Sequence, residues 1–427
     1  WKDSILKMHL PNNINDASTL TPMRRRLAYD ELLANQLAIA LIRNSPTLSE
    51  GRVIKSSGKL RNQVVERLPF KLTSAQRAAL FEIDKDMASG RRMLRLLQGD
   101  VGSGKTIVAL LAMLNAIEQN FQCAVMAPTT VLAKQHFNTI SAILNFADVK
   151  VEYLSGKERG KIREKTLSNI ATGRASVIIG THVLFQEEVS FKNLALLIID
   201  EQHKFGVHQR LALSDKGKRA DVLLMTATPI PRTLILTAYG NIDTSHLLEK
   251  PSNRCIVITR SMSKDRLSEV YKGIKRSIDS GDKIYWICPL VEESENVDVA
   301  AVLERYQVLE RKLGRKIVGL THGRMKDDEK TAVIESFKRG KIKVLVSTTV
   351  VEVGVDIGDA NIMVIEHAER FGLAQLHQLR GRIGRGTKKS MCLLVYATPL
   401  SAFTLGFITS HSPVHAETPL LDKVEFP

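Results

Sequence analysis

A glycine-rich segment that ends in lysine and threonine carries the clearest chemistry in this sequence. Residues 99–106 read GDVGSGKT, which has the spacing G-x-x-x-x-G-K-T. The apolar run RMLRLLQ precedes the segment and an alanine- and leucine-rich run follows it, so we expect a strand, a loop and a helix. Glycines let backbone N–H groups turn towards phosphate oxygens, and a helix N-terminus adds partial positive charge. This context favours a phosphate-binding loop over an ordinary glycine turn.

The residue types of this loop assign roles to its members. Lys105 is expected to reach the β- and γ-phosphates of a nucleotide, and the Thr106 hydroxyl is expected to bind Mg²⁺. The rest of the phosphate cradle is expected to consist of Gly99, Asp100, Val101, Gly102, Ser103 and Gly104. The loop therefore predicts a site for a nucleotide with its magnesium ion.

Two acidic residues follow another apolar run about a hundred residues further on. LALLIIDEQH covers residues 194–203 and contains Asp200, Glu201 and His203. A carboxylate at the carboxyl end of a parallel strand lies where the metal of a phosphate-binding loop is held. We therefore expect Asp200 to hold Mg²⁺, usually through water, and Glu201 to orient or deprotonate the attacking water.

An arginine-rich segment in the second half of the chain completes the expected site. QLHQLRGRIGRG, residues 375–386, contains Arg382 and Arg385. Guanidinium groups suit the charge that develops on a γ-phosphate, so hydrolysis would depend on closure of two parts of the chain. The alternative is a basic loop that binds the phosphate backbone of a nucleic acid. Gly354 and Asp356, in STTVVEVGVD, are also expected at the nucleotide.

The elements that must position these residues form two series of apolar strand-like runs, one between residues 94 and 227 and one between 283 and 397. Helix-length segments separate the runs, which predicts an α/β fold with two lobes, each a mainly parallel β-sheet covered by helices on both faces. We expect a joining helix and linker at 1–64, a first lobe at 65–240, a second lobe at 241–398 and a poorly ordered tail at 399–427, with the hinge near 240–252.

Composition narrows the class of protein and its partner. The 427 residues carry a formal net charge of +16, which favours an anionic polymer as partner. We find no apolar run of bilayer-spanning length and no secretory signal, so we expect no membrane partner and a cytoplasmic location. Three of the four cysteines lie in strand-like runs, so we expect buried, reduced thiols and no zinc site.

In this order, the segments resemble the motor core of superfamily 2 helicases, from about Leu68 to Tyr396. GDVGSGKT resembles motif I, APTTVLAKQH motif Ia, GTHVLF motif Ib, DEQH motif II, TAT motif III, VSTTVVEVGVD motif V and QLHQLRGRIGR motif VI. LPFKLTSAQ resembles the Q motif, which implies that Phe70 and Gln76 lie at the adenine. The resemblance implies two RecA-like lobes that bind and hydrolyse ATP with Mg²⁺.

The same resemblance implies a DNA path across both lobes. Motifs Ia and Ib would present hydroxyl, amide and backbone N–H groups for sequence-independent phosphate contacts, from Pro128, Thr129, Thr130, Gln135, Thr181 and His182. The alternative is that these residues only cap helices and close turns. His203 and Thr226–Thr228 are implied to report the nucleotide state to the DNA side.

Longer segments resemble the RecG family of DNA helicases within this superfamily: DEQHKFGVHQR, MTATPIPRTLILTAYGNID, YWICPLVEESE and GLTHGRMK. This implies ATP-driven action of a monomer on stalled forks and Holliday junctions in recombination and repair. Three alternatives stay open: a transcription-repair coupling translocase, an RNA helicase, and a DNA-binding remnant with weak or uncoupled ATPase. TPMRRRLAYDELLANQLAIAL resembles the family's helix between wedge domain and motor. The wedge domain itself is not found before it, and the tail is unlike the family's helical hairpin, so we expect a truncated family member.

Overall fold

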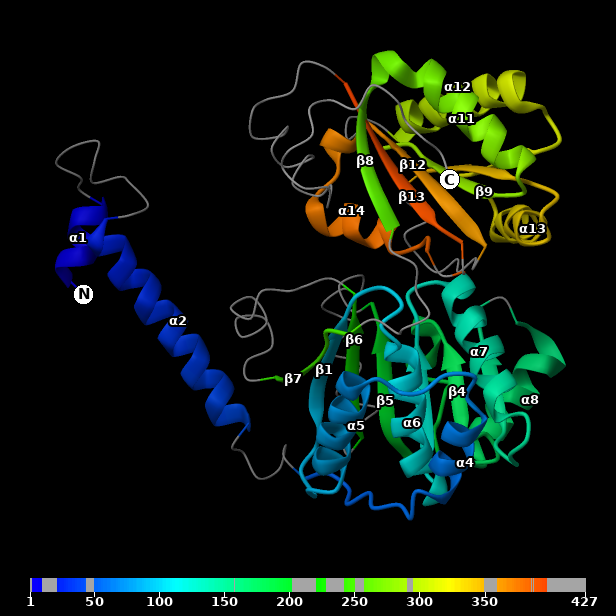
Figure 1. Cartoon of the computed structure of the whole chain (residues 1–427). Coiled ribbons are helices and arrows are strands. Elements are labelled where there is room, and N and C mark those ends of the chain that lie inside the picture. Colours follow the sequence, from blue (N-terminus) through cyan, green and yellow to red (C-terminus); the bar gives the residue numbers. More distant parts are fainter. Residues whose placement is uncertain are drawn as a thin grey trace.

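The computed structural model describes residues 2–9, 21–43, 50–156, 158–201, 220–227, 242–249, 257–289, 295–348, 359–384, 386 and 388–397. The expected tail from residue 399 onwards lies outside these residues, as do residues 240, 241 and 250–252 of the expected hinge. Figure 1 shows a helical pair, α1 (Lys2–His9) and α2 (Pro22–Arg43), and two α/β lobes. The two RecA-like lobes predicted from the sequence are confirmed.

The first lobe contains a seven-stranded sheet in the order β3-β4-β2-β5-β6-β1-β7, and every neighbouring pair is parallel. Its central strands are nearly continuous apolar runs because helices cover both faces of the sheet. The strands are β1 (Leu94–Gly99), β2 (Gln122–Met126), β3 (Val151–Leu154), β4 (Val177–Gly180), β5 (Leu194–Asp200), β6 (Asp221–Thr226) and β7 (Asp243–Leu247).

The second lobe contains a six-stranded, fully parallel sheet in the order β10-β11-β9-β12-β13-β8. The strands are β8 (Val257–Ser263), β9 (Lys283–Ile287), β10 (Val318–Thr321), β11 (Val344–Ser347), β12 (Ala360–Glu366) and β13 (Ser390–Tyr396).

Helices pack on both faces of each sheet, and neighbouring strand residues alternate between the two apolar clusters that result. Leu97 and Leu96 of β1 belong to opposite clusters, as do Tyr285 and Trp286 of β9. In the first lobe the helices are α4 (Lys59–Arg67), α5 (Ser74–Met87), α6 (Lys105–Glu118), α7 (Thr130–Leu144), α8 (Gly160–Ala171) and η2 (His182–Phe185). In the second they are η4 (Lys264–Arg266), α11 (Leu267–Asp279), α12 (Glu295–Leu313), α13 (Asp327–Lys338), η6 (Ala368–Arg370) and α14 (Leu373–Arg380).

The expected end of the first lobe at residue 240 is wrong. Strand β7 pairs in parallel with β1, from Arg95 opposite Asp243 to Gly99 opposite Leu247, so the first sheet extends at least to residue 247. The strand reads DTSHL and is buried at only two of its five positions, because it forms an edge of the sheet. A polar edge strand lacks the apolar run on which the boundary was based.

Two expectations from composition can be compared with the described residues. Cys123, Cys288 and Cys392 are free and buried, as predicted, and burial raises the pKa of the Cys392 thiol to about 12. In the described part of the chain, no helix combines the length and the apolar character that a bilayer crossing requires.

Candidate nucleotide site

The phosphate-binding loop joins the carboxyl end of β1 to the N-terminus of α6, as the sequence predicts. Gly102 and Gly104 have φ angles of 75° and 89°, in the left-handed region that glycine adopts without steric cost. Gly104 is the N-cap of α6 and provides no side-chain cap to it. The loop thus aims the backbone N–H groups of a helix N-terminus at the carboxyl edge of the sheet.

Lys105 lies inside this loop. Its Nζ donates to the carbonyl oxygen of Gly99 at 2.7 Å and to that of Asp100 at 3.1 Å. Burial lowers the pKa of Lys105, while the negative charges of Asp200 and Glu201 oppose that shift. The ammonium group therefore already lies in the electric field of both acids that the sequence assigns to the site.

The two acids at the end of β5 differ in their electrostatics. Burial opposes ionisation of Asp200, but its hydrogen bond to His136 and the charges of His136 and Lys105 lower its pKa overall. Burial and the adjacent Asp200 raise the pKa of Glu201, which lies in the left-handed region with φ of 48°. An ionised carboxylate beside a more basic one suits a metal ligand beside a proton acceptor.

The donor groups present fit Mg²⁺ bound together with a nucleotide. Asp200 is only 7% exposed at the carboxyl edge, and Thr106 occupies the first turn of α6. Among the described residues, no group of three or more His, Cys, Asp or Glu side chains forms a cage for a metal ion. Magnesium is commonly held by one or two carboxylates plus substrate phosphates, so Asp200 and Thr106 are an adequate protein contribution.

Sequence reasoning missed His136, which contacts the expected metal ligand directly. Its Nε2 lies 2.8 Å from Oδ2 of Asp200, and the residue is 6% exposed. His136 belongs to the buried stripe of α7, together with Leu132, Ala133 and Ile140. The signal in the sequence was a histidine at a helix position whose periodicity predicts burial. His136 thus links α7, the helix of motif Ia, to Asp200.

The second lobe contributes Arg382 to this site. Arg382 follows the C-terminus of α14, is 9% exposed, and its positive charge lowers the pKa of both Lys105 and Glu201. The structure therefore brings Lys105, Asp200, Glu201 and Arg382 together, as expected. The other expected site residues, His203, Thr228, Gly354, Asp356 and Arg385, lie outside the described residues.

Gln76 makes contacts that differ from the expected adenine contact. Its Oε1 accepts from the backbone N–H of Thr73 at 2.9 Å in a capping box, and its Nε2 donates to the carbonyl oxygen of Ser103 at 2.8 Å. Gln76 is 2% exposed, and its hydrogen bond to Ser103 ties the phosphate-binding loop to α5. Phe70 is 38% exposed. Adenine recognition by these two residues stays a prediction.

The residues expected at DNA follow β2 and β4, which are neighbours in the sheet, so they share its carboxyl edge. Thr129 caps α7 by accepting from the backbone N–H of Leu132 at 3.3 Å, which bears out its structural role. Thr181 is buried and His182 is exposed. The remaining members of the set, Pro128, Thr130 and Gln135, are partly exposed on the same edge. Their contact with DNA stays a prediction.

Comparison with known protein families gives one match in each lobe. Residues 73–236 match the DEAD/DEAH box helicase family, and residues 265–387 match the helicase conserved C-terminal domain. The ATP-dependent DNA helicase RecG of Escherichia coli strain K12 is 48% identical over 385 residues, which are 89% of this chain and 56% of that relative. RecG of Thermotoga maritima is 46% identical over 396 residues, which are 92% and 50% of the two chains.

Solved structures that are similar to this chain also include a RecG helicase. A structure of RecG bound to a three-way DNA junction is similar with a TM-score of 0.80 and 42% identity, over 96% of this chain and 54% of that one. The helicase MrfA bound to DNA is similar in fold, with a TM-score of 0.64 and 17% identity over 90% of this chain and 55% of that one. The chain thus spans about half the length of the curated relatives it matches.

Proposed function

Since 89% of this chain aligns with a RecG helicase at 48% identity, the chain belongs to the RecG helicases, and we propose that it is the ATP-driven motor of a DNA helicase that acts on branched DNA. One observation carries the proposal: the positive charge of Arg382, from the second lobe, acts on Lys105 and Glu201 of the first lobe. A site that is shared between two lobes can convert a nucleotide cycle into relative movement of the lobes.

The residues of the first lobe bind the nucleotide and prepare the water. Backbone N–H groups of the loop and of the α6 N-terminus hold the phosphates, and Lys105 moves from its carbonyl partners to the β- and γ-phosphate oxygens. Asp200 and Thr106 would hold Mg²⁺, which when bound offsets the charge of the phosphates. Glu201, whose pKa is raised, orients the attacking water and accepts its proton.

The second lobe and the DNA side complete the cycle. Arg382 stabilises the charge that develops on the γ-phosphate, so hydrolysis requires closure of the lobes. The hydrogen bond between His136 and Asp200 connects the metal ligand to α7, whose N-terminus carries the residues expected to contact the DNA backbone. We propose that these contacts are sequence-independent, and that the motor acts in the cytoplasm as a monomer.

Hydrolysis of ATP in the presence of Mg²⁺, with and without a three-way DNA junction, tests this proposal. We expect DNA to stimulate turnover and Lys105→Ala to lower it about 100-fold or more, because the variant loses a charge aimed at the transferring phosphate. Lys85→Ala, an exposed change on α5, is the matched control and should leave turnover intact. A folded parent chain that binds the junction without any turnover would contradict the motor and favour a binding remnant.

A further inference from the structure

Gly381 is a glycine whose backbone does not require glycine. It is the C-cap of α14, where its N–H donates to the carbonyl oxygen of His377 at 3.0 Å, and its φ and ψ of −66° and −10° are open to any residue. A Cβ atom at this position would lie 2.6 Å from Cβ of Val101 and 3.0 Å and 3.3 Å from its two methyl carbons. The missing side chain is therefore explained by a close contact with Val101.

This contact joins the two lobes at the nucleotide site. Val101 is the third residue of the phosphate-binding loop and is 6% exposed, while Gly381 immediately precedes Arg382. The positive charge of Arg382 is felt by Lys105 and Glu201, so Arg382 lies near both. The separation between Val101 and the α14 terminus therefore sets how closely Arg382 approaches the site.

We propose that Val101 and Gly381 form a contact stop that fixes the spacing of the closed lobes and thereby positions Arg382 against the nucleotide. Both are positioning residues, since they act through Arg382. The inference rests on the proposed ATPase. A methyl group at residue 381 would move the end of α14 away by about 1 Å, and a misplacement of this size can cost about 100-fold in rate.

The direct test is Gly381→Ala. We expect kcat for DNA-stimulated ATP hydrolysis to fall about 10- to 100-fold, with less than about a threefold change in the KM for ATP, because the phosphates are held by the first lobe. Gly372→Ala is the matched control: it changes the glycine at the other end of α14, where an added Cβ meets no atom within 4 Å. That variant should keep the parent's rate.

A second pair of variants separates the contact from a general effect of alanine at residue 381. Val101→Gly removes all three atoms that the new Cβ would meet, whereas Val101→Ala keeps the nearest one. We expect Gly381→Ala to cost at least about tenfold less in the Val101→Gly background than in the Val101→Ala background. An equal cost in both backgrounds would overturn the inference.

Energy transfer between dyes in the two lobes gives a readout that does not need turnover. Dyes on Lys85→Cys and Arg339→Cys suit this purpose, with Cys255 replaced by serine, because Cys123, Cys288 and Cys392 are buried. AMP-PNP with Mg²⁺ should raise transfer in the parent and raise it less in Gly381→Ala, whereas adding Gly381→Ala to Val101→Gly should leave transfer at the level of Val101→Gly alone. If a chain without ATPase activity shows this pattern, the contact stop is supported although the proposed ATPase is not. If turnover is normal and Gly381→Ala leaves transfer unchanged, the contact stop is refuted and the proposed ATPase stands.

Discussion

Asp221 buries a carboxyl group at the first position of β6, at the end of the strand opposite the nucleotide loop. One oxygen accepts from the backbone N–H of Met93 at 2.7 Å, and the residue is 1% exposed. Within the described residues the other oxygen has no hydrogen-bond partner. Burial raises the pKa of Asp221 to about 7, against the opposing effects of Met93 and Arg92. The folded protein therefore keeps this proton up to near-neutral pH, while the unfolded chain releases it near pH 4.

This difference predicts a pH dependence of stability. Because the folded state binds the extra proton, the free energy of unfolding contributed by Asp221 falls as pH rises from about 4 to about 7, by at most about 1.4 kcal/mol per unit. Asp221→Asn keeps an acceptor for Met93 and carries no charge. The variant should gain stability relative to the parent as pH rises through this window, as measured by urea unfolding of the first lobe between pH 5 and 8. The exposed Asp148→Asn is the control, and a flat difference for Asp221→Asn would contradict the assignment.

Site residues could be predicted from the sequence where a single short motif contains them, and were missed where they depend on a distant partner. Lys105 and Thr106 could be assigned because one loop of eight residues contains the whole motif. The contact of His136 with Asp200 joins residues 64 positions apart, and that of Gly381 with Val101 joins two lobes. Such pairs depend on tertiary packing, which local spacing does not encode.

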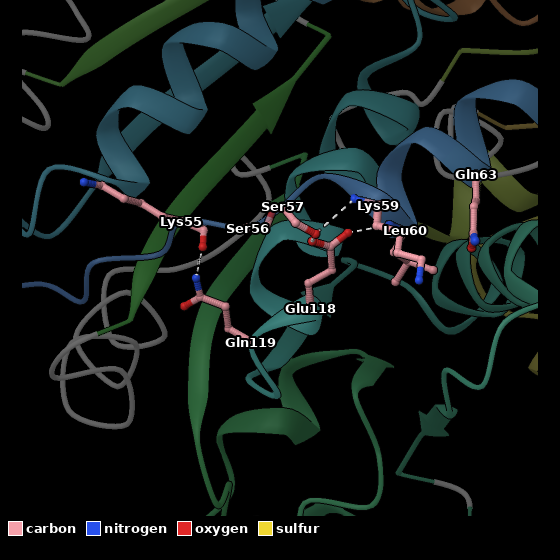
Figure 2. Close-up of a pocket in the computed structure, with 8 residues that line it drawn as sticks. All are labelled: Lys55, Ser56, Ser57, Lys59, Leu60, Gln63, Glu118 and Gln119. Carbon is pink, nitrogen blue, oxygen red and sulfur yellow. Dashed lines mark hydrogen bonds between the residues drawn. The ribbon is translucent and has the colours of Figure 1, made fainter.

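At the scale of elements, α4 begins in an unusual way. Its N-cap is Gly58, which has no side chain with which to cap the helix. Glu118, the last residue of α6, takes this role: Oε2 accepts from the Ser57 hydroxyl at 3.1 Å and from the Gly58 N–H at 3.0 Å, and Oε1 accepts from the Leu60 N–H. Figure 2 shows the Glu118 carboxylate pointing at this segment, in a surface hollow of about 600 Å³. Since the Glu118 carboxylate already accepts from these donors, they are not free to bind an anion in the hollow.

The cap predicts a destabilisation that depends on charge. Glu118→Ala should lower the free energy of unfolding by about 1–2 kcal/mol, because the first-turn donors of α4 lose their partner. The hydrogen bonds outweigh burial and lower the pKa of Glu118, so its charge stabilises the fold above the unfolded pKa, and this effect is lost as pH falls through the folded pKa. Glu118→Gln should therefore differ from the parent at pH 7 and approach it in acid.

Urea unfolding of both Glu118 variants at pH 7 and pH 4 measures this effect. The exposed Glu164→Gln on α8 is the control for loss of one surface charge. A gap between Glu118→Gln and the parent that stays constant between the two pH values would contradict a charged cap.

The success of strand prediction followed how completely each strand is buried. The interior strands, such as β5 and β12, are buried at every position and read as apolar runs. The edge strands β3, β7 and β8 were not foreseen, whereas β10, an edge strand that is buried at three of its four positions, was predicted from the run KIVGLTH. The burial of the three unforeseen strands is partial, as in β8, where only Thr259 and Met262 are buried, so the sequence carries neither a continuous nor a strictly alternating apolar pattern.

At the scale of the whole molecule, the two lobes have separate cores that touch through small contacts. The apolar clusters of the first lobe surround its own sheet, and those of the second lobe surround Trp286 and its neighbours. Val131 of α7 packs against the second-lobe cluster that contains Leu376 and Leu379 of α14. The same helix thus carries expected DNA contacts, the link to Asp200 and a contact with the core of the second lobe. Such an arrangement lets the lobes respond separately to a ligand that binds one of them.

Separate cores predict two thermal transitions in calorimetry. AMP-PNP with Mg²⁺ should raise the transition temperature of the first lobe, because a ligand that binds only the folded lobe stabilises that lobe. At a concentration 100 times its Kd, the ligand should increase the free energy of unfolding of this lobe by about 2.7 kcal/mol. The second transition, followed by the fluorescence of buried Trp286, should move less, since the second lobe gains only the closure contacts. Lys105→Ala should remove the shift of the first transition and leave the second in place. A single transition, or equal shifts of both, would mean that the lobes fold as one cooperative unit and that lobe closure is not an independent step.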